Sequence, residues 1–379
     1  MRDPRGIIVV TDPTYVDELY IGKNKFFDKA DKDKDTYYQW FGDSIFLSRS
    51  DQHWHQSRKH LSAAFYKDKM NLLLRTIMSV TNDRVQQWRS TFAQPSQVQD
   101  GPGHAEMSLT KEISDMLVDS MLGSVFGMRS VNHTLTLGYY GEMFDVTLGR
   151  YMKIIGGRFF SRIYHPLRQL FDMFDRWNLN ADEKENWDNL ERLRAFVKKM
   201  INDRKELLQG GNGQAAQGKF DFLTQLLDDS FFIGAATQTS SVLFTNVLYF
   251  LLKNPEAKEK CLNEIKTKLL PHLPPGTDLT KDTTWHQLML SEETVDSCPY
   301  LLQCIYETLR IDSSATVSTA LKVTETVEIK DKMIRSDSKI LINMQRLHLN
   351  PQQWQEPHRF IPDRFNPESP YYLTPAVQR

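Results

Sequence analysis

The segment from residue 231 to residue 252 constrains the fold of this chain most strongly. It runs for 22 residues without a charged side chain, which is long enough to cross a lipid bilayer as a helix. Polar side chains argue against a membrane span, because they are costly inside a bilayer. They are Thr237, Gln238, Thr239, Ser240, Ser241, Thr245 and Asn246. The segment therefore predicts a helix through the core of a protein, apolar on nearly all sides and covered by other elements.

The composition is that of an ordinary globular protein. Hydrophobic residues make up 40% of the chain and charged residues 25%. The length of 379 residues is enough for one large domain or two modest ones. The net charge of −1 gives no reason to expect a nucleic-acid partner. The three cysteines, Cys261, Cys298 and Cys304, form no C-x-x-C pair. Their spacing predicts a reducing environment without disulfides or structural zinc.

Helical periodicity dominates the rest of the chain. We expect helices at residues 15–20, 55–74, 109–126 and 186–208, and short strands at residues 323–329 and 339–343. Glycine- and proline-rich connectors at residues 95–103, 210–218 and 271–276 do not separate the motifs into independent units. We therefore predict a single domain over residues 1–379, mainly α-helical with a small β-sheet.

A glutamate and two arginines near the end of the chain form a candidate ion network. Glu307 and Arg310 lie three residues apart and share a helix face, and Arg364 follows in a proline-bounded loop. A buried network of this kind fixes positions through paired arginine–carboxylate geometry. The alternative is an exposed helical pair with an unrelated loop arginine. The E-x-x-R pattern also occurs at Glu191/Arg194 and Glu356/Arg359, so the order of motifs along the chain must decide.

That order resembles the cytochrome P450 family. Residues 54–58 (W-H-Q-S-R) match the W-x-x-x-R of the helix near the haem propionates, and residues 232–240 look like the oxygen-activating helix. Residues 307–310 fall on the E-x-x-R helix. Residues 354–357 (W-Q-E-P) running into 362–365 (P-D-R-F) match the P-E-R-F region. The likeness covers nearly the whole chain and implies the P450 fold.

Three features of the family are not found among these residues. The segment F-x-x-G-x-R-x-C-x-G, whose cysteine ligates the haem iron, is absent, so no metal ligand is assigned. The N-terminal anchor and first strand are missing too, because residues 7–10 and the following T-D-P resemble a later strand and turn. The oxygen-activating helix also lacks its usual first turns before residue 231. We expect a P450 fold that is incomplete at both ends, and we interpret the chain as a fragment or a defective gene model.

The resemblance assigns haem contacts to Trp54, Arg58 and Ala235. Trp54 and Arg58 lie four residues apart on one helix face, where an indole N–H and a guanidinium both donate to a haem carboxylate. Taken without context, such a pair is typical of cation–π packing. His55, His60 and His348 receive no catalytic role. The three cysteines lack the motif's glycine and arginine neighbours and are interpreted as buried spectators.

The resemblance assigns catalysis to Thr239 and its neighbour Gln238. The threonine hydroxyl helps to deliver protons to iron-bound dioxygen in the family. The preceding residue is usually acidic there, whereas Gln238 forms hydrogen bonds but releases no proton near neutral pH. The alternative is that Thr237, Thr239 and Ser240 only bond back to the preceding helical turn.

A complete homologue would be a haem-thiolate monooxygenase that oxidises an apolar small molecule with electrons from an NADPH-dependent reductase. It would lie on the cytoplasmic face of the endoplasmic reticulum membrane. These residues alone, without an anchor, are expected to be cytoplasmic or aggregated. A non-catalytic binding or scaffold protein that has lost haem chemistry is the alternative function.

Overall fold

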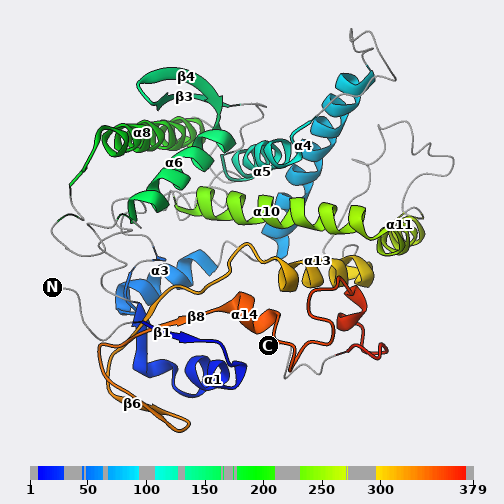
Figure 1. Ribbon diagram of the computed structural model, residues 1–379. Coiled ribbons are helices and arrows are strands. Elements are labelled where there is room, and N and C mark those ends of the chain that lie inside the picture. The colour runs from blue at the N-terminus through cyan, green and yellow to red at the C-terminus, as the bar shows by residue number, and fades with distance from the viewer. Residues whose placement is uncertain are drawn as a thin grey trace. The chain divides into compact units, whose positions relative to one another are not determined.

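The computed structural model describes residues 7–29, 45–46, 48–62, 67–93, 107–126, 133–163, 165, 174, 177–209, 231–269, 271 and 296–372. The chain divides into two compact units. Figure 1 labels the helices and strands. The first consists of Met1–Ala64, Thr134–Ala235 and Ala315–Asn350, and the second of Phe65–His133, Ala236–Ser314 and Pro351–Arg379. The expected fold class, mainly α-helical with little β-structure, is confirmed. The single domain over residues 1–379 stays a prediction.

The first unit contains a four-stranded sheet with the strand order β1-β8-β5-β2. Strand β1 (Ile7–Val10) runs parallel to β8 (Lys339–Ile342), whereas β5 (Leu321–Val323) is antiparallel to β8 and to β2 (Phe27–Lys29). A separate hairpin joins β6 (Val327–Ile329) to β7 (Lys332–Ile334). The strand expected at residues 323–329 is therefore two strands in two sheets. The break lies at the polar T-E-T of residues 324–326, where the chain turns between the sheets.

Helices of the first unit partly match the expected ones. Helix α1 (Pro13–Asp17) starts at Asp12, whose carboxylate accepts from the Thr14 N–H at 2.9 Å, and continues as a π-helix (Glu18–Gly22). Helix α3 (Gln52–Ser62) ends well before residue 74, so one helix over residues 55–74 is wrong. At its end the Ser62 hydroxyl donates to the Arg58 carbonyl at 2.8 Å, a local bond that competes with helix continuation. Helix α14 (Met344–His348) is short.

A hairpin that the sequence analysis did not predict is bound to the long helix α8 (Ala181–Gln209). Strands β3 (Thr134–Tyr139) and β4 (Glu142–Thr147) are joined by Tyr140 and Gly141, both at positive φ, as a two-residue hairpin turn requires. The buried Asn189 side chain of α8 exchanges two 2.8 Å hydrogen bonds with the Gly138 backbone. Figure 1 shows the hairpin along α8, with α6 (Leu148–Ile163) beside it.

The second unit is helical. Helix α4 (Lys67–Ala93) contacts α5 (Leu109–Phe126), whose ends are those expected from its periodicity. The pair is joined by a buried ion pair, in which Arg84 Nη2 lies 2.6 Å from Asp119 Oδ2. Helix α11 (Pro255–Leu269) contacts α13 (Pro299–Ile311), and α13 contacts the 3₁₀ turn Pro362–Phe365.

The uncharged segment forms helix α10 (Phe231–Lys253), as predicted. Thr237 and Ser241 are buried. Its apolar side chains are covered less completely than expected, because Val242, Phe244, Tyr249 and Leu252 are between 40% and 64% exposed. Among the helices that the structure describes, none is both long enough and apolar enough to cross a membrane.

Candidate functional site

Helix α13 carries the centre of the candidate site, and a carboxylate from α11 fixes where this helix begins. Pro299 occupies its first turn, and the preceding Cys298 provides no side-chain cap. The Glu264 carboxylate accepts instead from the N–H groups of Tyr300 and Leu301, each at 2.9 Å. These N–H groups have no partner inside the helix, so Glu264 acts as a cap from a neighbouring element. The start of α13 is thereby fixed two turns before Glu307.

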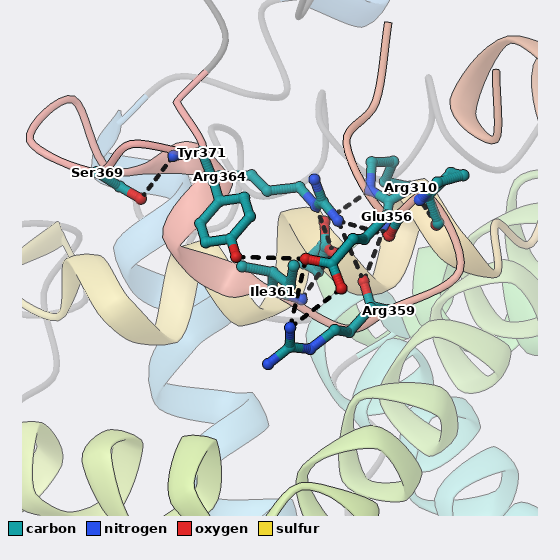
Figure 2. Close-up of polar contacts among 9 residues, drawn as sticks. Arg310, Glu356, Arg359, Ile361, Arg364, Ser369 and Tyr371 are labelled. Carbon is teal, nitrogen blue, oxygen red and sulfur yellow. Dashed lines mark hydrogen bonds and ion pairs between the residues drawn. The ribbon is translucent and has the colours of Figure 1, made fainter. Parts of the chain in front are cut away.

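The structure brings Glu307, Arg310 and Arg364 together, and Figure 2 labels the two arginines. The Glu307 carboxylate is fully buried and accepts from Arg310 Nε at 2.7 Å and Arg310 Nη2 at 2.8 Å. It also accepts from Arg364 Nε at 3.1 Å and from the Ile361 N–H at 2.9 Å. One carboxylate therefore binds two buried guanidiniums and the backbone of the following loop.

Backbone carbonyls of residues 356–359 accept further hydrogen bonds from both arginines. Arg310 Nη1 donates to the Pro357 carbonyl at 2.7 Å, and Arg364 Nη2 donates to the Glu356 carbonyl at 2.8 Å (Figure 2). Glu356 adopts a positive φ of 47°, an uncommon conformation for a residue with a side chain. Two arginines thus hold this loop by its main chain. Sequence reasoning missed these contacts, because a backbone carbonyl leaves no signal in a sequence pattern.

Two positive charges share one buried negative charge in this network, so desolvation is its main electrostatic cost. Burial lowers the pKa of Arg364, and the Glu307 carboxylate opposes that shift. Aromatic rings provide part of the compensation. The Arg310 guanidinium lies 4.9 Å from the ring centre of the buried Trp354, and that of Arg364 lies 5.8 Å from the ring of Tyr371. Trp354 is a second residue whose contact the sequence analysis missed, although its W-Q-E-P motif was noted.

The other two E-x-x-R pairs form exposed ion pairs. Arg194 lies 2.6 Å from Glu191, and both side chains are at least one-third exposed. Arg359 lies 3.1 Å from Glu356, with side chains 65% and 48% exposed. Identical spacing therefore leads to different environments, and only the Glu307 pair is buried.

Trp54 and Arg58 lie together on α3, and the Arg58 guanidinium lies 5.1 Å from the centre of the indole ring. The indole N–H donates to the Ile45 carbonyl at 2.9 Å, so it is not the spare donor that we expected for a haem carboxylate. The ammonium of Lys29, whose pKa is lowered by burial, donates to the same carbonyl at 2.7 Å and lies 5.0 Å from the ring. The Ile45 carbonyl therefore accepts the hydrogen bond that we expected the indole to donate to a haem carboxylate.

Arg58 retains a free charge. It is exposed, and among the described residues no carboxylate lies within ion-pair distance of it. An exposed guanidinium that is held against an indole fits an anionic group such as a haem propionate.

The other predicted residues lie on α10. Thr239 is exposed, whereas the Nε2 atom of Gln238 is buried and has no hydrogen-bond partner in the described part of the chain. An unused buried donor of this kind is rare and fits a bound acceptor or an ordered water. The side chain of Ala235 lies outside the described residues, as does that of His60. Trp54 and Arg58 belong to the first unit, and Glu307, Arg310 and Arg364 belong to the second.

The cysteines are buried. Cys261 and Cys304 pack in one apolar cluster with Phe360, and a thiol–thiol hydrogen bond together with burial raises the pKa of Cys304. Burial raises the pKa of Cys298. Among the residues that the structure describes, no group of three His, Cys, Asp or Glu side chains is placed to hold a metal ion.

Comparison with known proteins identifies the family. The cytochrome P450 family model matches residues 2–375. The rat (Rattus norvegicus) protein "Cytochrome P450 4F6" is 23% identical over 352 residues, which cover 89% of this chain and 61% of that protein. The human (Homo sapiens) "Ultra-long-chain fatty acid omega-hydroxylase" is 24% identical over 98% of this chain and 68% of that protein. "Cytochrome P450 81F1" of Arabidopsis thaliana is 24% identical over 97% of this chain and 71% of that protein.

The chain thus spans about three fifths of the length of the rat relative. The family match extends over nearly every residue of the chain, including α3, α10, α13 and the loop that the two arginines hold. The chain belongs to the cytochrome P450 family.

Proposed function

We propose that the protein carrying these residues is a haem-thiolate monooxygenase that oxidises an apolar organic substrate with dioxygen. The observation that carries the proposal is the buried network of Glu307, Arg310 and Arg364, in a chain that the family model matches over residues 2–375. Buried charges are costly unless all of them are paired, so such a network is of value for the position that it fixes. Its role here is to hold the loop of residues 356–364 in register for the haem-ligand segment.

Haem is the cofactor of complete members of this family, and when bound with a cysteine thiolate it supplies the activation of dioxygen. Arg58 would hold a haem propionate, with the Trp54 ring fixing the direction of its guanidinium. Gln238 offers its free amide donor to an acceptor or a water, and the Thr239 hydroxyl passes a proton along that path. The thiolate is proposed to come from the family's cysteine segment, whose motif these 379 residues do not contain.

The remaining roles follow from the family and are also part of the proposal. Electrons come from an NADPH-dependent reductase, and the complete enzyme is attached to the cytoplasmic face of the endoplasmic reticulum membrane. One relative is named as a hydroxylase of ultra-long-chain fatty acids. Ultra-long-chain fatty acids are therefore the first substrate class to assay.

The test is spectroscopic. The natural gene product that contains residues 1–379 is expressed, reduced and treated with carbon monoxide, and the far-red-shifted Soret band of thiolate-ligated haem is expected. Glu307→Ala should abolish this band, and Glu191→Ala, which alters an exposed E-x-x-R pair, should retain it. A natural product that is monodisperse, folds cooperatively and binds no haem would overturn the proposal in favour of a scaffold protein.

A further inference from the structure

Two of the three buried cysteines meet where α11 contacts α13, within the second unit. Cys261 of α11 is 3% exposed, and Cys304 of α13 is fully buried. Both side chains belong to one apolar cluster with Phe360, and the Cys304 thiol donates a hydrogen bond to the Cys261 sulfur. None of the roles discussed above uses either side chain. Contact between two sulfur atoms is the first requirement for joining them as a disulfide.

The hydrogen bond between the thiols makes the two cysteines chemically unequal. It stabilises the thiolate of Cys261 and lowers the pKa of Cys261, against the effect of burial. The same bond, together with burial, raises the pKa of Cys304. The thiolate is the nucleophilic form of cysteine. Cys261 is therefore the sulfur that attacks an oxidant, and Cys304 is the neighbour that completes a disulfide.

The third cysteine provides a comparison within the same chain. Cys298 is buried to the same degree, at 1% exposed. Its sulfur lies 4.0 Å from the Ser297 hydroxyl, and burial raises its pKa. Burial therefore does not distinguish Cys298 from the pair, whereas the contact between two sulfur atoms does.

Helix α11 covers the pair but is itself a surface helix. Its buried residues are Ala257 and Cys261, one turn apart, and Leu262 is 43% exposed. A helix that is held by so narrow a buried stripe opens locally at a lower free-energy cost than the whole unit unfolds. Hydrogen peroxide is small enough to reach Cys261 through such an opening. Oxidation should therefore be slow, and it should start from the folded protein.

We propose that Cys261 and Cys304 form a redox-modification site, at which a peroxide oxidises the two thiols to a disulfide that joins α11 to α13. The Cys261 thiolate attacks one peroxide oxygen, the O–O bond breaks, and the departing hydroxide is protonated to water. Cys261 is then a sulfenic acid. The Cys304 sulfur attacks the Cys261 sulfur, the S–O bond breaks, and the departing hydroxide takes the Cys304 proton to form a second water. The two thiols together lose two electrons and two protons, and the peroxide gains them.

The disulfide would lie at the start of the helix that carries the ion network. Cys304 lies one turn before Glu307 on α13, and Glu264 of α11 already caps the Tyr300 and Leu301 N–H groups. A covalent link between the same two helices should restrict local opening there. Oxidation should therefore slow hydrogen exchange of the segment that contains Tyr300 and Leu301. The proposal is independent of the proposed monooxygenase function.

Peptide mapping tests the site in the unmodified sequence. The natural gene product that contains residues 1–379 is reduced, freed of reductant and treated with hydrogen peroxide without denaturant. The remaining thiols are then alkylated in denaturant, and the protein is digested with trypsin and chymotrypsin. Cleavage after Tyr300 separates Cys298 from Cys304. The expected product is a cross-linked pair of peptides containing Cys261 and Cys304, which dithiothreitol separates, while Cys298 is recovered alkylated.

A matched pair of variants separates the two roles of Cys304. Cys304→Ser keeps a hydrogen-bond donor beside Cys261 but forms no disulfide, so a sulfenic acid that dimedone traps should accumulate at Cys261. Cys304→Ala removes the donor as well, and oxidation of Cys261 should be at least about tenfold slower than in Cys304→Ser. Cys298→Ala is the control and should form the disulfide normally.

The mapping of the unmodified sequence decides the proposal even where a variant does not fold. The proposal is overturned if peroxide leaves Cys261 and Cys304 as free thiols in the folded protein. It is also overturned if Cys298 takes the place of either partner in the disulfide, or if all three cysteines are oxidised at the same rate.

Discussion

Substitution of Glu307 by alanine is the most direct test of how the second unit is held together. Glu307 accepts four hydrogen bonds, from Arg310 Nε and Nη2, Arg364 Nε and the Ile361 N–H. The substitution removes the negative charge but leaves two guanidiniums that are at most 2% exposed. Glu307→Ala therefore leaves a buried positive charge without a counter-charge and a backbone N–H without an acceptor.

The expected cost is large relative to the stability of a domain. Removing one partner of a buried ion pair costs about 3–5 kcal/mol. We expect the upper part of this range, because two arginines lose the same carboxylate. Natural domains are stable by only about 5–15 kcal/mol, so the variant loses a large fraction of its folding free energy.

Urea denaturation followed by tryptophan fluorescence measures the global effect, and hydrogen exchange of the segment containing Ile361 measures it locally. The local measurement is needed because two units need not unfold in one transition. Glu191→Ala is the matched control, since it removes the same residue type at the same spacing from an exposed pair, where about 0–1 kcal/mol is expected.

A double variant separates lost charge from lost packing. Glu307→Ala destabilises the fold by leaving a buried positive charge, so adding Arg364→Met should restore part of the lost stability. The changes in the free energy of unfolding caused by the two substitutions are therefore not additive. Equal destabilisation by Glu307→Ala and Glu191→Ala, or strict additivity in the double variant, would refute the reasoning.

Three further outcomes are expected. Asn189→Ala leaves the buried N–H and carbonyl of Gly138 unpaired, so urea denaturation should report a loss of roughly 2–4 kcal/mol, and a loss below that of an exposed substitution would contradict the assigned contact. Burial raises the pKa of Tyr151 from 10.0 to about 12, so the folded phenol keeps a proton that the unfolded chain releases. The contribution of the neutral phenol to the free energy of unfolding is complete below pH 10 and falls by about 2–3 kcal/mol as the pH rises toward 12. Urea denaturation across this pH range should show a smaller fall for Tyr151→Phe. The polypeptide of residues 1–379, reconstituted with haem, reduced and treated with carbon monoxide, should lack the thiolate Soret band, because its three cysteines are buried outside the ligand motif; observing that band would show that one of them ligates iron.

Much of the local structure follows from sequence alone, because helical periodicity and charge are local properties. The 22-residue uncharged run places α10, and the spacing of apolar residues places both ends of α5. The order of motifs along the chain indicates the family, which the match over residues 2–375 shows. The same order pointed to Glu307, Arg310 and Arg364 as one group before any contact was known.

Burial, in contrast, depends on residues that are distant in the chain. Three E-x-x-R pairs are equivalent as local patterns, and only tertiary structure buries Glu307, by bringing Ile361 from 54 residues away onto its carboxylate. The β3–β4 hairpin was not predicted for the same reason, because Asn189, which binds the hairpin backbone, lies 51 residues from Gly138 in the chain. The hydrogen bond of the Trp54 indole N–H likewise depends on which acceptor the fold supplies. The acceptor is the backbone carbonyl of Ile45, whereas a haem carboxylate was expected. A sequence pattern records which groups can interact, whereas the fold decides which of them lose water and must find a partner.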